Sequence, residues 1–218
     1  MTGYPNSPRL ASAGIVLVDP GSGAVTRVIA LQYVPDTLTR ALESQAMAEE
    51  PRRSQALRLK GPAAETITLE AVLDATDRLE FPDQNAATVE TGIFPDLAAL
   101  EMLVQPASAQ LSRQNQQANA GILEIAPIEM PLALFVWSAQ RIVPVRVSSL
   151  SITEEAFDPR LNPIRAKVSM TLKVLTVDDL GFSHRGGGLF MAYLQAREAL
   201  MARAARPGID VLGIGGLP

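Results

Sequence analysis

The stretch AFDPRLNPIRAKVSMTLKVLT, from Ala156 to Thr176, decides the fold. From residue 166 onward it alternates between apolar and polar residues, which is the pattern of a β-strand with one packed face and one solvated face. The apolar positions are Ala166, Val168, Met170, Leu172 and Val174, and the polar positions between them are Lys167, Ser169, Thr171 and Lys173. Pro159 and Pro163 restrict the backbone just before this strand, so we expect a fixed corner where it begins.

Other segments have the same strand character. Gly14–Val18 and Val25–Val34 flank a turn rich in proline and glycine, which predicts a β-hairpin. ETITLEAVLD, residues 65–74, alternates with Ile67, Leu69, Ala71 and Leu73 on its packed side. PLALFVWS and RIVPVRVSSLSIT, residues 131–138 and 141–153, predict two further strands. The chain is therefore expected to be mainly β.

The strand at 141–153 contains a change of parity. Val145 and Val147 point to one side of a regular strand, whereas Leu150 and Ile152 point to the other. An extra residue near Ser148-Ser149 would return both pairs to the same face, so the sequence predicts a β-bulge there.

The helical signals are fewer. A short helix is expected near Asp96–Leu103, between Pro95 and Pro106, and a longer one near Leu189–Ala204. We expect the second helix to pack against the sheet or a neighbouring subunit through Phe190, Tyr193, Leu194 and Leu200. The glutamine-rich segment Ala107–Pro127 is interpreted as a long exposed loop. Asp36–Met47 fits either a helix or an edge strand.

The composition is that of a soluble globular protein. The 218 residues fit one domain with a core of its own. With 19 basic against 23 acidic residues there is no positive excess for a polyanion, so nucleic acid is not an expected partner. The apolar run Ile15–Val18 is too short for a signal or membrane helix, and we expect no direct membrane insertion.

The residues that usually carry catalysis are sparse. The chain has no cysteine and one histidine, His184, in a segment read as a flexible loop. Gly186–Gly188 lack the lysine and hydroxyl of a phosphate-binding loop and are interpreted as a hinge. Three carboxylate pairs suit turns and caps better than catalysis, namely Asp74 with Asp77, Glu154 with Glu155, and Asp178 with Asp179. We therefore expect no enzyme activity, cofactor or metal.

Three stretches resemble one protein family. They are ALQYVPDTLTRALE at 30–43, LKGPAAETITLEAVLDATD at 59–77, and FVWSAQRIVPVRVSSLSITEEAFDPRLNPIRAKVSMTLKVL at 135–175. These resemble the tube-adaptor proteins of contractile injection systems, phage-tail-like machines that drive a rigid tube through a target envelope. The last stretch has the family's phenylalanine, asparagine-proline and arginine-alanine as Phe157, Asn162-Pro163 and Arg165-Ala166. The family's earlier asparagine-proline is replaced here by Val34-Pro35.

The resemblance implies a fold class. It is mainly β (α+β), an antiparallel tail-tube-like β-barrel or sandwich with a short helix and a C-terminal helix. Residues 1–180 would form the tail-tube-like domain, and residues 181–218 a glycine-rich hinge, the C-terminal helix and a tail. Many such adaptors continue into a LysM module, and this chain ends about where that module would begin.

The resemblance also implies a function. The chain would be a structural ring component of a baseplate, a homo-oligomer expected to be a hexamer, joining the inner tube to the spike hub. Its partners would be the inner tube protein, the spike or hub protein and other baseplate proteins. Lys167, Ser169, Thr171 and Lys173 would line the channel, where the two lysines of every copy would form a positive belt. Assembly is expected in the cytoplasm, and release within an extracellular injection particle stays open.

Two alternatives remain at this stage. Within the same machines, the chain could be an inner-tube or tube-cap subunit. In a different class, it could be a monomeric carbohydrate- or peptide-binding β domain that uses Trp137 and the loop at Gln114–Asn119.

Overall fold

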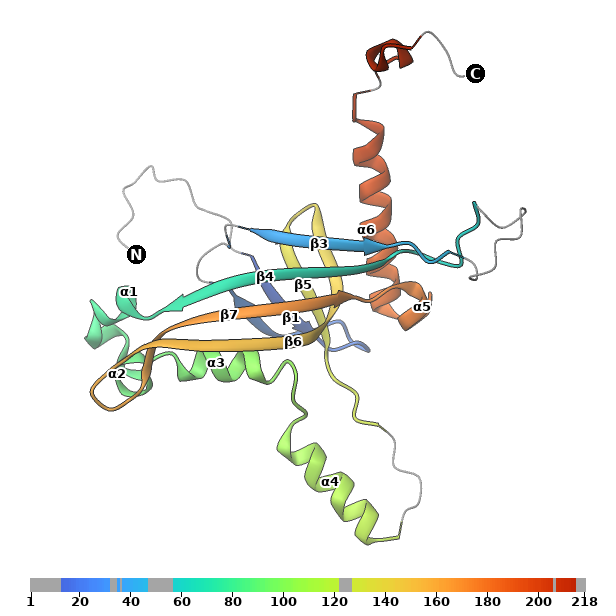
Figure 1. The fold of residues 1–218 in the computed structure, drawn as a ribbon. Coiled ribbons are helices and arrows are strands. Elements are labelled where there is room, and N and C mark those ends of the chain that lie inside the picture. Colours follow the sequence, from blue (N-terminus) through green and yellow to red (C-terminus); the bar gives the residue numbers. More distant parts are fainter. Residues whose placement is uncertain are drawn as a thin grey trace.

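One open antiparallel sheet organises the protein (Figure 1). The structure, a computed structural model, describes residues 13–31, 35, 37–46, 57–121, 127–205 and 207–214. Its seven strands lie in the order β2-β1-β5-β6-β7-β4-β3. They are β1 (Gly14–Val18), β2 (Val25–Ala30), β3 (Leu38–Glu43), β4 (Ala64–Asp74), β5 (Leu132–Ser138), β6 (Arg141–Phe157) and β7 (Pro163–Val174). The expected mainly β, antiparallel fold is confirmed, but the sheet does not close into a barrel.

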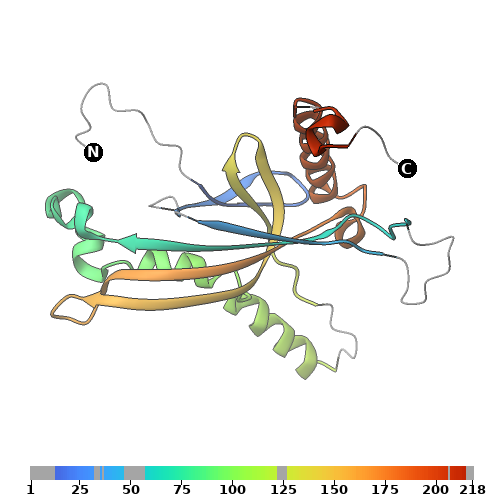
Figure 2. The same ribbon diagram turned by 45° about the horizontal axis from the view of Figure 1, so that its top comes forward.

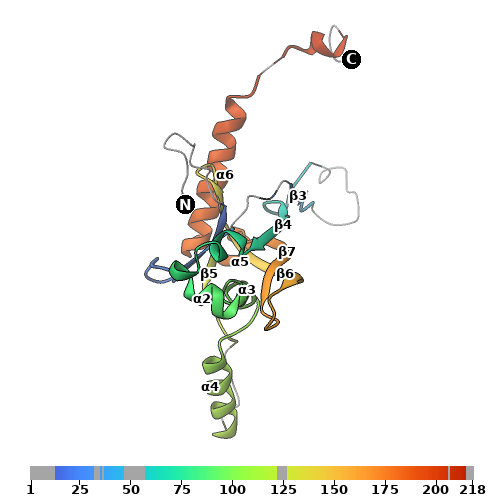
Figure 3. The same cartoon turned by 90° about the vertical axis from the view of Figure 1, so that its left-hand side faces the viewer.

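Helices lie around the sheet and at its ends. They are α1 (Thr76–Leu79), η1 (Pro82–Gln84), α2 (Ala86–Thr91), α3 (Phe94–Glu101), α4 (Ser108–Asn119), α5 (Val177–Leu180), α6 (Arg185–Ala202) and η2 (Ile209–Leu212). Figures 1 and 2 show α1 and α2 at one end of the long strands and α5 and the start of α6 at the other. Helix α4 stands away from the body, and α6 extends beyond the sheet in the opposite direction (Figure 3).

The sheet curls around a large hydrophobic core, beside which Val18, Leu132 and Leu134 form a second, smaller cluster. Ile15 of β1 and Phe135 of β5 are register partners on neighbouring strands, and both are fully buried in the same cluster as Ile67 of β4, which lies three strands away from β5. Leu97 and Leu100 of α3 complete this cluster. The predicted apolar side of β7 is confirmed, because Ala166, Val168, Met170, Leu172 and Val174 have no exposed surface.

The predicted bulge in β6 is confirmed. The β6–β7 register shifts between Val147 and Ser149, so that Val147 faces Leu172 and Leu150 faces Met170. The Ser148 hydroxyl donates a hydrogen bond to the Thr171 carbonyl at 2.9 Å. Strand β5 pairs only with the first part of β6, from Arg141 to Val145. Among the described residues, the second part of β6 therefore has β7 on one side and no strand on the other.

The loop predicted at Ala107–Pro127 is wrong for most of its length, because Ser108–Asn119 form α4. Residues Ser108–Asn119 contain no glycine or proline, and their alanines and glutamines favour a helix. The Gln110 side chain accepts a hydrogen bond from the Ala107 N–H at 3.1 Å, which satisfies one donor at the start of the helix. The expected exposure of the segment is correct, since α4 buries no residue.

Other boundaries also differ from those expected. The Asp36–Met47 alternative is resolved in favour of an edge strand, β3, while Gln32–Val34 lie outside the described residues. Helix α6 begins at Arg185, so Gly186–Gly188 form its first turn and not a loop hinge. A Cβ atom at Gly187 would collide with the Gly181 carbonyl oxygen, so glycine here permits close packing of α6 against α5. The expected division of the chain into a tail-tube-like domain at residues 1–180 and a C-terminal part at residues 181–218 stays a prediction.

Candidate functional site: the polar sheet face and the β6–β7 corner

The solvated positions of β7 belong to a polar face that continues across four strands. Lys167 lies between Val72 of β4 and Thr153 of β6, and Lys173 lies between Thr66 and Arg146. The polar face comprises Thr39, Ala41 and Glu43 of β3, Thr66, Thr68, Glu70 and Val72 of β4, Lys167, Ser169, Thr171 and Lys173 of β7, and Arg146, Ser149, Ser151 and Thr153 of β6. The structure thus brings all four predicted channel residues onto one surface.

The two lysines of the polar face are ion-paired. Lys167 Nζ lies 3.3 Å from Glu155 Oε1, and Lys173 Nζ lies 2.8 Å from Asp179 Oδ1. Burial alone would raise the pKa of Asp179, but hydrogen bonds from Lys173 and the Thr176 N–H outweigh it and lower the pKa. The carboxylate therefore stays ionised at neutral pH. A ring of such copies would carry a belt of paired charges and not the belt of free cations expected from the sequence.

The corner between β6 and β7 is held by side-chain hydrogen bonds. Asp158 Oδ1 accepts from the N–H groups of Arg160 at 2.7 Å and Asn162 at 2.8 Å. The Asn162 amide donates to Asp158 Oδ2 at 2.8 Å. These bonds lower the pKa of Asp158, the Asn162 side chain contributing most. Leu161 has a φ of 67°, the left-handed conformation that favours glycine.

The same corner is tied to the helices beside it. The Asn162 amide also donates to the Glu90 carbonyl at 3.0 Å, and the Ile93 N–H donates to the Pro163 carbonyl at 2.8 Å. A Cβ atom at Gly92 would collide with that carbonyl oxygen, and Gly92 has a φ of 60°. The asparagine-proline that carries the family resemblance therefore joins the long hairpin to the α2–α3 connection.

Several large hydrophobic side chains are exposed at this end of the molecule, among exposed charged residues such as Asp83 and Glu90. The hydrophobic side chains are Phe81, Val89, Phe94, Phe157 and Leu161. They come from α2, from the starts of η1 and α3, and from the corner, which lie together in Figures 1 and 2. Exposed apolar groups gathered at one end are typical of a surface that contacts another protein.

A buried ion cluster fixes α6 to the sheet. Glu65 of β4 is only 3% exposed, and its carboxylate lies 2.6 Å from the Arg40 guanidinium of β3 and 3.3 Å from that of Arg197 in α6. The Tyr193 hydroxyl lies 3.3 Å from both Glu65 oxygens and accepts from Arg40 at 3.0 Å. Burial, and then the negative charge of Glu65, raise the pKa of Tyr193. The sequence analysis missed this cluster, although Glu65 has the core-facing parity of Ile67.

The predicted packing residues of α6 divide into two groups. Phe190 and Tyr193 are buried, and Leu194 is half-buried against the core. Leu200 is 44% exposed, because the second half of α6 extends past the sheet. Packing of Leu200 on a neighbouring subunit stays a prediction.

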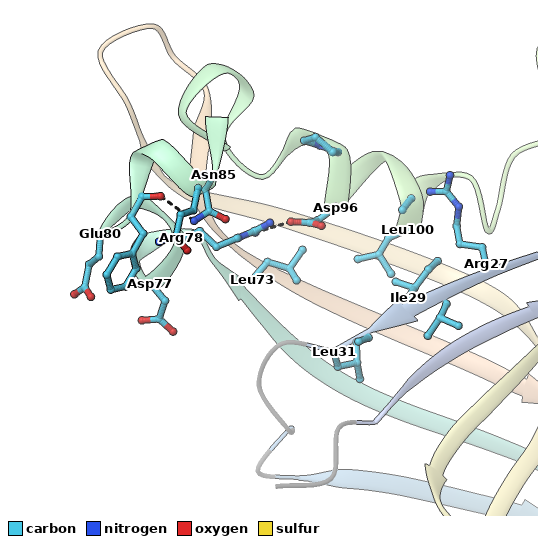
Figure 4. Close-up of a pocket in the computed structure, with 16 residues that line it drawn as sticks. Arg27, Ile29, Leu31, Leu73, Asp77, Arg78, Glu80, Asn85, Asp96 and Leu100 are labelled. Carbon is cyan, nitrogen blue, oxygen red and sulfur yellow. Dashed lines mark hydrogen bonds and ion pairs between the residues drawn. The ribbon is translucent and has the colours of Figure 1, made fainter. Parts of the chain in front are cut away.

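A groove of about 990 Å³ lies between β2 and helices α1–α3 (Figure 4). Its apolar floor is formed by Ile29, Leu31, Leu73 and Leu100. Charged and polar residues line its sides, including the Arg78–Asp96 ion pair at 2.6 Å, with Arg27, Asp77, Glu80 and Asn85. No signal in the sequence analysis pointed to this groove, because it forms between elements far apart in the chain.

His184, Trp137 and the segment Gln114–Asn119, which the sequence analysis considered as possible site residues, take part in helix capping, ring packing and a helix. His184 is the N-cap of α6, where its Nδ1 accepts from the Gly186 N–H at 3.0 Å, so it is not in a loose loop. Trp137 is half-buried with its ring 6.0 Å from that of Phe135. Gln114–Asn119 belong to α4, which corrects the loop assumed for a carbohydrate- or peptide-binding site.

The described residues contain no group of three or more histidine, cysteine, aspartate or glutamate residues arranged to hold a metal. Within the same part of the chain, no helix combines the length and hydrophobicity needed to cross a membrane.

Comparison with known proteins gives weak structural similarities. Neither a protein-family model nor a curated protein matches the sequence. The tail of an empty gene transfer agent particle, refined with C6 symmetry, is similar over 75% of this chain and 90% of that chain, with 12% identity and a TM-score of 0.30. The virion of a native gene transfer agent particle is similar over 74% and 95%, with 12% identity and a TM-score of 0.27. Similarity at this level says nothing about what the chain does.

Proposed function

We propose that this protein is a structural ring component of a contractile injection system baseplate, assembled in the cytoplasm, that joins the inner tube to the spike hub. The observation that carries the proposal is the four-stranded part of the sheet, β6-β7-β4-β3. Within the described residues, β3 is unpaired on its outer side, and so is the part of β6 beyond Ser149. Unpaired strand edges are sites where another chain can add.

The strand directions suit a closed ring. Each neighbouring pair from β6 to β3 is antiparallel, so β3 and β6 run in opposite directions. If β3 of one copy lies beside β6 of the next, every pair around the ring stays antiparallel. The two free edges are also staggered, because β3 is level with Met170–Val174 of β7 and the free part of β6 is level with Pro163–Thr171. Stagger of this kind accompanies the strand tilt of a barrel.

The two faces of this sheet have different surroundings. Helix α6 reaches the core-facing side, where Tyr193 meets Glu65, whereas the polar face is on the opposite side. The polar face would therefore line a water-filled channel, with α6 outside. In a six-fold ring, four strands per copy, spaced about 4.8 Å apart and tilted by about 40°, would give a backbone diameter of about 48 Å. The family resemblance supplies the six-fold order and the partners.

Cysteine cross-linking tests the ring, because the chain has no cysteine of its own. Thr39→Cys on β3 would be combined in turn with Ser149→Cys, Ser151→Cys and Thr153→Cys on β6, in the presence of the tube and spike proteins. A disulfide needs Cβ atoms about 4 Å apart, so one register should give a ladder of cross-linked copies up to a closed ring. Thr68→Cys on the central strand β4, paired with the same β6 variants, is the matched control. Monomeric protein under all these conditions would refute the proposal.

A further inference from the structure

We infer that Glu154 of one copy pairs with Arg40 of the next copy in the ring. The ion cluster around Glu65 would thereby be completed across the contact between β6 and β3. The inference rests on the proposed ring. It supplies the side chains that make a second copy of this chain, and not any extended chain, the partner of these two edges.

The ion cluster carries more positive than negative charge in its contacts. Its two guanidinium groups, Arg40 and Arg197, share the single carboxylate of Glu65. Arg40 uses Nε and Nη2 for Glu65 and Tyr193, which leaves further N–H donors of the guanidinium. The Arg40 side chain is 23% exposed and lies on β3, whose outer side has no strand within the described residues. A second carboxylate can therefore reach Arg40 from the edge of the sheet.

Glu154 is an acidic residue on the core-facing side of β6. It lies opposite Ala166 of β7, which is fully buried, so its side chain is on the same side of the sheet as the ion cluster. Leu150 and Ile152, the preceding residues on this side, pack against the core. Glu154 is exposed and forms no ion pair with any other residue that the structure describes. A single inward-pointing charge protects an edge from indiscriminate pairing, but the opposite charge on the other edge makes it selective for that edge.

The backbone groups of the two edges also match. Residues of an antiparallel pair alternate between hydrogen-bonded and non-hydrogen-bonded positions. The Ala75 N–H donates to the Ile164 carbonyl at 2.8 Å, which fixes this alternation along β4 and β7. Counted from there, the N–H and C=O groups that point outward belong on β3 to Leu38, Arg40 and Leu42, and on β6 to Leu150, Ile152 and Glu154. These are also the core-facing residues, so two copies can join their edges with the hydrogen bonds and the faces of the sheet both in agreement.

Two registers bring Glu154 beside Arg40. In the first, the two residues lie directly opposite each other, and Ile152 covers Leu42. In the second they are diagonal neighbours about 7–8 Å apart, a distance that long side chains span, and Leu150 covers Leu42. Leu42 is 46% exposed in the single chain. Both registers therefore cover an apolar side chain and balance a charge at the same contact.

The choice of cysteine pair tests the register. With Thr39→Cys on β3, both registers make Thr153→Cys the nearest of the three β6 positions, and they leave Ser149→Cys and Ser151→Cys farther away. We therefore expect the pair with Thr153→Cys to give the longest ladder of cross-linked copies. A ladder that forms best with Ser149→Cys or Ser151→Cys would mean a ring in another register and would overturn the inference.

Charge reversal tests the ion pair. Glu154→Arg is added to the chain with Thr39→Cys and Thr153→Cys, and the Tm of the isolated chain should not change because Glu154 is exposed. We expect the ladder to fall at least fivefold, since two positive charges would then meet at the contact. An arginine favours the thiolate of a neighbouring thiol, so slower disulfide chemistry would not explain the loss. Glu101→Arg, the same change at an exposed residue at the end of α3, is the matched control and should leave the ladder unchanged.

The outcomes separate this inference from the ring proposal. Equal ladders from the Glu154→Arg and Glu101→Arg chains would overturn the ion pair, whereas the ring would stand. If no cysteine pair gives a ladder, the ring proposal fails and the inference fails with it.

Discussion

Replacing Glu65 with glutamine removes the negative charge that Arg40, Tyr193 and Arg197 share, and keeps the shape of the side chain. Loss of one partner from a fully buried ion pair costs roughly 3 to 5 kcal/mol, because the other charge remains in a dry site. Here the arginine side chains are 23% and 37% exposed and can recover part of their hydration. We therefore expect the free energy of unfolding to fall by about 2 to 3 kcal/mol.

The assay is urea unfolding followed by circular dichroism, together with a thermal melt. For a chain of this length, a loss of about 2 to 3 kcal/mol lowers Tm by roughly 4 to 12 °C. Glu70→Gln is the matched control, since Glu70 lies on the same strand but on the polar face, and it should change stability by less than about 0.5 kcal/mol. Equal stability of the Glu65→Gln and Glu70→Gln proteins would refute the reasoning that the cluster holds α6 on the sheet.

Three further predictions concern other parts of the fold. Met170→Ala should lower the free energy of unfolding by about 2 to 5 kcal/mol because it leaves a cavity in the core, whereas Lys173→Ala on the polar face should lower it by under about 1 kcal/mol. Equal losses of stability for the two variants in urea unfolding would contradict the two-faced strand. Leu161→Gly should raise the unfolding free energy by about 1 kcal/mol by relieving the positive φ, yet weaken assembly through loss of an exposed apolar side chain, as native mass spectrometry can measure. The pKa of Tyr193 is raised in the folded state, so unfolded chains lose this proton first as pH rises past about 10, and the free energy of unfolding should fall there. Tyr193→Phe should flatten this decline. An unchanged dependence of stability on pH in the variant would contradict the assignment of the decline to Tyr193.

The sequence predicted the parts of the fold that depend on strand periodicity. The alternation around Met170 and Ile67 correctly identified the core faces of β7 and β4, and the parity change after Val147 located the bulge. Helix α4 was missed because none of its residues is buried, and its sequence lacks the apolar stripe by which helices are identified. The interpretation of Gly186–Gly188 as a hinge failed because glycine serves equally for flexibility and for close packing.

The candidate site was only partly accessible from sequence. The four polar residues of β7 were identified, but the carboxylates that neutralise its lysines come from outside that strand, and their proximity depends on the fold. The open sheet and the groove depend on which strand edges remain unpaired, and the local sequence pattern does not predict this. Glu65 was the one detectable signal, an acidic residue at a core-facing position of an otherwise apolar strand.

The length and pairing of β6 have a mechanical consequence. Its hydrogen bonds to β7 lie across the strands and extend from Val145 to Phe157, while its first residues also pair with β5. A pull along the strand axis would strain all of these bonds together in shear, so resistance to rupture would grow with the length of the hairpin. A pull that separates the strands at the corner would load them one at a time, starting with Asp158 and Asn162. The β6–β7 hairpin would therefore resist force applied along its strands and yield first where a force opens the corner.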